Sequence, residues 1–185
     1  MKSFVSAVSI AVLALSAPGA AASGFAVSSP ELREGGGIAA EQVFNSFGCT
    51  GGNVSPALAW RNAPAGTKSF AVTVYDPDAP TGSGWWHWVV FNIPATATGL
   101  AKNAGRSGAN ALPAGSVQSR TDFGQPGYGG PCPPAGDRAH RYRFTVYAPK
   151  TEMLPLDENA PAAMVGFHLH QNLLGKQALN ASYGR

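Results

Sequence analysis

The chain has 185 residues, and its 13 lysines and arginines exceed its 10 acidic residues by too little to form the cationic face that nucleic-acid binding requires. Its 23 glycines and 15 prolines are typical of a protein with many turns and few long helices, so we predict a single, mainly β domain. No stretch after residue 22 is long and apolar enough to cross a bilayer, and we expect no transmembrane segment in the mature chain.

The first 22 residues have the pattern of a cleavable signal peptide. Met1 and Lys2 form a short basic region, residues 4–15 are apolar, and small residues follow as far as Ala22. A membrane anchor is the alternative interpretation of the same stretch. We expect residues 1–22 to be removed on export, and residues 23–185 to form one domain in the periplasm or outside the cell.

Only short strands are predicted before residue 68. They lie around residues 25–27, 38–44 and 55–60. Pro56 lacks the amide hydrogen that a central strand would donate, so we expect the last of the three to lie at a sheet edge.

The two strongest strand patterns cover residues 69–75 and 86–93. In the first, the larger apolar residues at every second position are expected to face the core, and Asp76 continues this face. These residues are Phe70, Val72 and Val74. In the second strand, alternation predicts one shared face made of Trp85, His87, Val89, Phe91 and Ile93.

The second half of the chain combines loops with one further strong strand and one helix. In chain order we predict a loop over 94–116, a short strand over 117–121, a stiff Gly- and Pro-rich loop over 124–136, and a strand over 140–148. The inward face of this last strand is expected to hold His140, Tyr142, Phe144 and Val146. A helix is predicted with Asn159 as its N-cap, Pro161 in its first turn and its end at Gly175. Residues 178–183 then return as a short strand or tail.

Three polar side chains are predicted to meet at one end of the core. Asp76 ends one inward face, whereas His87 and His140 begin two others, and antiparallel neighbours bring these positions together. A carboxylate can fix the tautomer of one imidazole so that its other nitrogen faces a pocket. Backbone amides around Gly130 could add donors, and the set would suit a small oxyanion.

Two cysteines, Cys49 and Cys132, lie in Gly-rich loops. In an exported chain a disulfide between them is the default expectation, and two free thiols are the alternative. Neither cysteine has a second Cys or a His at ligand spacing, so we expect no metal site.

Four ordered blocks resemble the signature of the phosphatidylethanolamine-binding proteins, also called Raf kinase inhibitor-like proteins. The blocks are Asp76-Pro-Asp-Ala-Pro80, Trp86-His-Trp88, Gly129-Gly-Pro-Cys-Pro-Pro134 and His140-Arg-Tyr142. The segment from Cys49 to Trp60 is similar to the bacterial branch in particular.

The resemblance implies an antiparallel β-sandwich with a few short peripheral helices and an anion-binding pocket at one end. Carried over position by position, the pocket residues are Asp76, Pro80, His87, Gly130, Pro131, His140 and Tyr142. Together with the tight reversal between Asp76 and Trp85, the resemblance also predicts a cis Ala79–Pro80 bond.

The implied function is that of an exported binding protein for a small anion, such as phosphate or a phospholipid headgroup, with no catalytic step and no cofactor. One alternative is a protein that inhibits a protease or a kinase-like target through the pocket rim. Another is a weak hydrolase in which Ser83, His87 and Asp76 act together, although Ser83 lacks the surroundings of a hydrolase nucleophile elbow.

Overall fold

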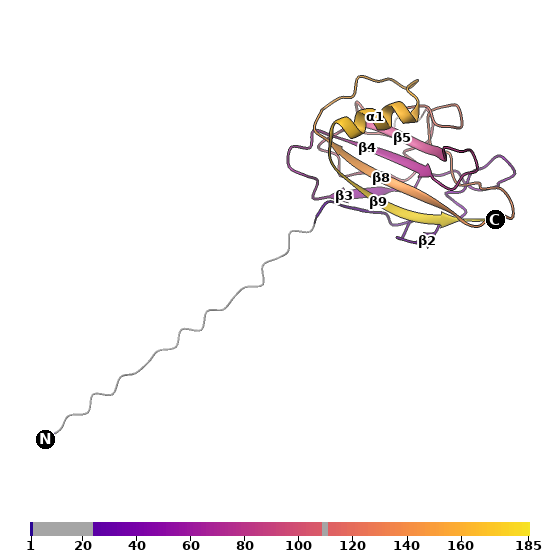
Figure 1. The fold of residues 1–185 in the computed structure, drawn as a ribbon, viewed down its shortest axis with the longest axis horizontal. Helices are drawn as coiled ribbons and strands as arrows, with labels where there is room; N and C mark the ends of the chain where they lie inside the picture. The colour runs from indigo at the N-terminus through magenta and orange to yellow at the C-terminus, as the bar shows by residue number, and fades with distance from the viewer. Residues whose placement is uncertain (2–23, 109–110) are drawn as a thin grey trace.

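The structure is a computed structural model that describes Met1 and residues 24–108 and 111–185. Apart from Met1, the predicted signal peptide lies outside the described residues. The described part forms two sheets and one helix, which confirms the prediction of a mainly β fold (Figure 1). None of its helices is long and apolar enough to span a membrane.

The larger sheet has six strands in the order β2-β9-β8-β4-β5-β7. Their bounds in this order are Gly36–Gly37, Leu173–Tyr183, His140–Pro149, Ser69–Asp76, Trp85–Pro94 and Val117–Gln118. All neighbours are antiparallel, as predicted, except β2 and β9, which run parallel at one edge. β2 and β9 lie near opposite ends of the sequence, so no hairpin joins them and forces them to run antiparallel.

The smaller sheet has three strands in the order β1-β3-β6, with bounds Ala26–Ser28, Leu58–Arg61 and Gly99–Leu100. β3 is therefore the central strand, and the prediction of an edge position is wrong because Pro56 lies just before the strand begins. No strand forms at residues 38–44, whereas β6 lies in a segment predicted as loop. The main hydrophobic core contains residues of both sheets, among them Trp60, Leu100, Val74 and Phe144.

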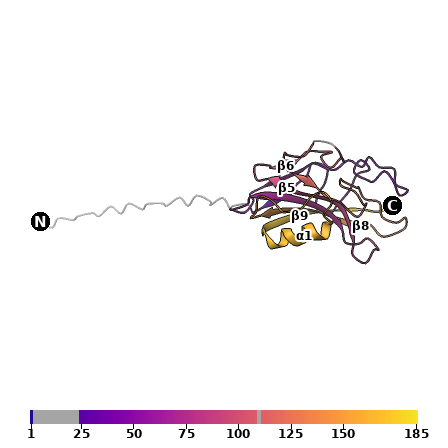
Figure 2. The ribbon, with the colours of Figure 1, turned by 90° about the horizontal axis from the view of Figure 1, so that it is seen from above.

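A second hydrophobic cluster lies between the larger sheet and the helix α1, Ala162–Gln171. Figure 2 shows α1 against one face of this sheet, with β6 on the opposite side. The N-cap of α1 is Pro161, without a side-chain hydrogen bond, so the prediction of Asn159 is wrong. The Asn159 amide donates instead to Asp157 Oδ1 at 2.9 Å, which keeps this residue in the preceding turn. The helix ends at Gln171, and Gly175 belongs to β9.

The strand β5 contains two register shifts against β4, and these divide its predicted face. Trp88 and Val90 belong to the main core, whereas Val89 and Phe91 belong to the cluster under α1. The prediction of one common face from Trp85 to Ile93 is therefore wrong, because each extra residue in a bulge resets the alternation. One shift lies between the pairs Val74–Trp88 and Tyr75–Trp86, and thus leaves His87 as the unpaired residue.

Candidate functional site

A cavity of about 160 Å³ opens where β4 ends and β5 and β8 begin. Five of the predicted pocket residues line it, namely Asp76, Pro80, His87, His140 and Tyr142. Its other walls include the aromatic rings of Phe47, Trp85 and Phe123 and the loop residues Cys132, Pro133 and Pro134. The structure thus brings together the three polar groups that strand alternation places at one end of the core.

Asp76 is almost fully buried, and its carboxylate accepts three hydrogen bonds. Oδ1 accepts from the backbone amides of Asp78 at 2.8 Å and Ala79 at 3.1 Å, which closes the turn after β4. Oδ2 accepts from Nδ1 of His140 at 2.7 Å. One carboxylate therefore fixes both the turn and the orientation of an imidazole on the neighbouring strand.

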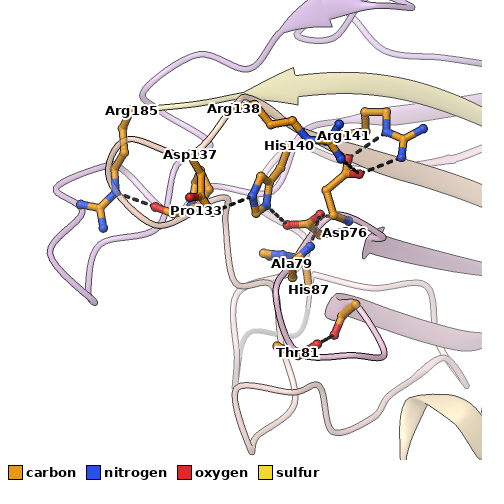
Figure 3. Close-up of polar contacts among 12 residues, drawn as sticks. Asp76, Ala79, Thr81, His87, Pro133, Asp137, Arg138, His140, Arg141 and Arg185 are labelled. Carbon is orange, nitrogen blue, oxygen red and sulfur yellow. Dashed lines mark hydrogen bonds and ion pairs between the residues drawn. The ribbon is translucent and has the colours of Figure 1, made fainter.

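His140 begins β8 and lies between two carboxylates, as Figure 3 shows. Its Nδ1 donates to Asp76, and its Nε2 lies 3.6 Å from Oδ2 of Asp137. As an imidazolium, the ring would donate from both nitrogens. The Asp137 side chain is 44% exposed, so a ligand in the cavity can compete with it for Nε2.

His87 has a different environment, in which the backbone determines its tautomer. Its Nδ1 lies 2.7 Å from the Gly129 carbonyl oxygen, which can only accept, so this nitrogen carries the proton. Burial lowers the pKa of His87 to about 4, although the Gly129 carbonyl and the charge of Asp76 act in the opposite direction. At neutral pH the ring is uncharged, and its Nε2 is a hydrogen-bond acceptor.

Tyr142 packs its ring edge to face with His87, with the ring centroids 5.1 Å apart. Its side chain is fully buried, and its hydroxyl finds no hydrogen-bond partner of normal geometry among the described residues. Burial raises the pKa of Tyr142, and the charge of Asp76 raises it further, so the hydroxyl keeps its proton. The hydroxyl interacts with the Asp76 carboxylate without forming a hydrogen bond of normal geometry, so a ligand in the cavity can offer it a better-placed acceptor.

Gly130 and Pro131 do not line the cavity. The Gly130 amide donates to Oδ1 of Asn53 at 2.8 Å, and the Pro131 carbonyl accepts from the Phe44 amide at 3.0 Å. A Cβ at Gly130 would overlap the backbone carbonyl of Gln42. Both residues hold two loops together in close contact, and the Gly130 amide is not free for an anion.

Asp78 has a structural role that the sequence left open. Its carboxylate accepts from Nε and Nη2 of Arg141 at 2.8 and 2.7 Å, and from Arg138 at 3.1 Å. The Arg141 guanidinium holds the pKa of Asp78 well below its usual range. The two carboxylates point apart because β4 ends at Asp76 and the chain turns at Asp78, whose amide donates to Asp76 Oδ1.

A disulfide joins Cys49 to Cys132 with a Sγ–Sγ distance of 2.08 Å and connects the two loops that wall the cavity. Arg185 bridges the same loops. Its guanidinium donates to the carbonyl oxygens of Pro133 at 2.7 Å and Gly48 at 2.9 Å, and Figure 3 shows the first of these bonds. Nothing in the sequence around Arg185 indicates that it joins these two loops.

The geometry does not assemble the triad of Ser83, His87 and Asp76. Asp76 bonds to His140, His87 bonds to a backbone carbonyl, and Ser83 does not line the cavity. The Ala79–Pro80 bond is trans, so the prediction of a cis bond is wrong, and the turn is held instead by the bonds of Asp76. Within residues 24–108 and 111–185, no three His, Cys, Asp or Glu side chains gather as metal ligands.

The sequence model of the family described as phosphatidylethanolamine-binding protein matches residues 28–184. The Escherichia coli protein YbcL is 51% identical over 183 residues, covering 99% of this chain and 98% of YbcL. The crystal structure of YbcL, titled as a member of the mammalian PEBP family, superposes with a TM-score of 0.87 over 88% of this chain and 99% of that one. A Mycobacterium tuberculosis protein named as lipoprotein LppC is 39% identical over 130 residues, 70% of this chain and 58% of LppC.

Proposed function

Because the chain belongs to the phosphatidylethanolamine-binding protein family, we propose that its cavity binds a small oxyanion, such as phosphate or the phosphate of a lipid headgroup. The observation that carries this proposal is the Asp76–His140 pair beside the unpartnered Tyr142 hydroxyl. Asp76 orients the imidazole and balances its charge when it is protonated. The imidazolium and the tyrosine hydroxyl then offer two donors to one bound anion.

Calorimetric titration with inorganic phosphate and with phosphoethanolamine tests this function. Replacing His140 with Ala removes a charge-assisted hydrogen bond and should weaken binding by about tenfold to a hundredfold. The matched control is His170→Ala, since this histidine is exposed on α1 and does not line the cavity. Absence of wild-type binding at millimolar ligand, or equal binding by all three proteins, would contradict the proposal.

The role proposed is binding without a catalytic step. It is supported by the absence of Ser83 from the cavity wall and by the bond of His87 to a backbone carbonyl. We expect no turnover of ester substrates above background. Ester hydrolysis that disappears in the variant Ser83→Ala would favour the hydrolase alternative.

The second candidate is a protein-interaction role, and the exposed aromatic rim of the cavity favours it. Phe47 is 65% exposed, and its ring lies 5.3 Å from that of Phe44 and 5.9 Å from that of Phe123. An inhibitor of a protease or a kinase-like target would use this rim. A photo-crosslinker at position 47 should then trap one defined protein, whereas a pure anion carrier should give no protein adduct.

We also propose that the chain is exported. Support comes from the N-terminal pattern of residues 1–22, from the disulfide and from the similarity to a protein named as a lipoprotein. The full chain should appear in the periplasmic fraction without free thiols. A chain that lacks residues 2–22 should stay in the cytoplasm with both thiols reduced.

A further inference from the structure

The two histidines of the cavity differ in the hydrogen bonds that they offer to a ligand, and His87 requires a ligand with a hydrogen-bond donor. Its Nδ1 proton is committed to the Gly129 carbonyl at 2.7 Å. The side chain is 4% exposed and lines the cavity, so the opposite nitrogen, Nε2, is the atom that a ligand meets. In the neutral ring this atom has a lone pair and no hydrogen.

The surroundings of His87 keep its ring neutral at physiological pH. The titratable groups around it are Asp76 on β4, Asp122 in the loop after β7, and His140 and Tyr142 on β8. The two carboxylates favour a proton on the ring, but burial outweighs them and lowers the pKa of His87 to about 4. The ring therefore accepts a hydrogen bond throughout the neutral range.

The remaining polar groups of the cavity disfavour a fully ionised ligand. Both oxygens of Asp76 already accept hydrogen bonds from the protein, and the negative charge of this carboxylate remains next to the ligand. Asp137 adds a second carboxylate near Nε2 of His140. The Tyr142 hydroxyl can donate to one anionic oxygen, whereas His87 needs an O–H group to accept from.

We propose that the cavity selects an oxyanion that still carries a proton, such as a phosphate monoester in its monoanionic form, over anions without an O–H group. This inference rests on the proposed oxyanion-binding function and specifies its ligand class. The P–O–H group donates to Nε2 of His87, and an anionic oxygen accepts from Tyr142 and from protonated His140. An anion without the proton places an oxygen lone pair against a nitrogen lone pair in a buried site, and such unmatched groups discriminate strongly.

Three small monoanions of similar shape test the selection. Methyl phosphate carries an ionisable O–H with a pKa of about 6, whereas dimethyl phosphate and methyl sulfate have none. At about pH 5 calorimetry should show methyl phosphate binding at least about tenfold more tightly than either analogue. The ratio should fall towards one as the pH rises to about 8 and methyl phosphate loses its proton. Dimethyl phosphate and methyl sulfate stay monoanions throughout, so their affinities report any effect of pH on the protein itself.

A pair of variants assigns the selection to its residue. His87→Leu removes the acceptor, and its ratio of affinities should approach one, whereas His170→Gln on the exposed face of α1 should keep the wild-type ratio. Binding of all three probes within about threefold by the wild-type protein would overturn the selection and leave the oxyanion-binding function intact. No binding of any probe would overturn both.

Discussion

Two carboxylates only two residues apart have separate tasks in this protein. Asp76 lies at the cavity and holds His140, whereas Asp78 lies on the other side of the turn and anchors Arg141. The turn after β4 accounts for the separation, because Asp76 is the last residue of the strand and Asp78 lies beyond it, with its amide bonded to Asp76 Oδ1. The last residue of β4 therefore belongs to the site, and the turn after it supplies a residue that supports the site.

Substitution of Asp76 by Asn should separate the two functions of this side chain. The Asn Oδ1 can still accept from the amides of Asp78 and Ala79, but its NH₂ group meets Nδ1 of His140 and forces the proton to Nε2. We expect phosphate affinity to fall at least about tenfold, with little loss of stability, because the neutral ring offers the anion no charge-assisted hydrogen bond. Nitrogen chemical shifts should report the changed tautomer. Asp137→Asn, at 3.6 Å and partly exposed, is the control and should change affinity by less than about threefold.

His87 should make folding stability depend on pH in a defined window. Because its folded pKa of about 4 lies below the ordinary 6.5, the unfolded chain binds more protons between these values. The contribution of His87 to the free energy of unfolding is fully present above about pH 6.5. It falls by about 3 kcal/mol as the pH decreases to about 4. The contribution of Asp78 disappears only below its ordinary value of 3.8, so the two windows do not overlap.

Urea unfolding at several pH values between about 4 and 7 measures this slope. His87→Gln should remove it, whereas His170→Gln should retain it, since the latter histidine is exposed. A slope that survives in His87→Gln would mean that another group takes up the proton.

Within the elements, the sequence predicted β4 and β8 more accurately than β5. Along the core-facing residues of β4 and β8 the alternation holds, and it places Asp76, His140 and Tyr142 correctly at the cavity. In β5 the alternation fails at two bulges, and His87 reaches the cavity as the unpaired residue of one of them. Counting every second residue cannot detect a bulge, because the extra residue leaves no mark in hydrophobicity.

One of the two bulges has a sequence signal that becomes clear in the structure. Asn92 has φ of 56°, a conformation that asparagine tolerates better than most residues. Its buried side chain accepts from the Leu154 amide at 2.7 Å and donates to the Leu154 carbonyl at 3.3 Å. The bulge therefore fixes the loop that leads to α1.

Asn92→Leu should lower the free energy of unfolding by about 3 kcal/mol, because it leaves the two buried Leu154 groups unpaired and strains the backbone. Asn103→Leu isolates the strain, since Asn103 has φ of 65° but is exposed, and we expect a loss of about 1 kcal/mol. Chemical denaturation of both variants measures the difference. Equal losses would show that the bonds to Leu154 contribute nothing.

At the scale of the whole molecule, the cavity depends on loops that are distant in sequence. The disulfide spans 83 positions and joins the loop around residue 49 to the one around residue 132, and Arg185 bonds to both. The sequence could suggest the disulfide, because an exported chain with two cysteines is expected to pair them in an oxidising compartment. The sequence could not show that Gly130 holds two loops together, because the bond from its amide to Asn53 depends on the three-dimensional path of both segments.

The double variant Cys49→Ser, Cys132→Ser should lose about 4 kcal/mol of unfolding free energy. Without the cross-link, the segment between the two positions is unrestricted in the unfolded chain, whose entropy therefore rises. Phosphate affinity should also fall, because Phe47 and Pro133 lie on the two freed loops. Reduction of the wild-type protein should give the same stability as the variant. Unchanged affinity in the reduced protein would show that Arg185 and the backbone contacts suffice to shape the cavity.

The parallel pair at the edge of the larger sheet has a consequence for protein synthesis. In the sheet, residues 36–37 pair with residues 181–182, and β9 lies between β2 and β8. A ribosome must therefore release almost the entire chain before this sheet can close, and such non-local pairing is slow to form. If the chain is exported as proposed, a translocation channel that receives it during synthesis meets a chain whose larger sheet has not yet closed.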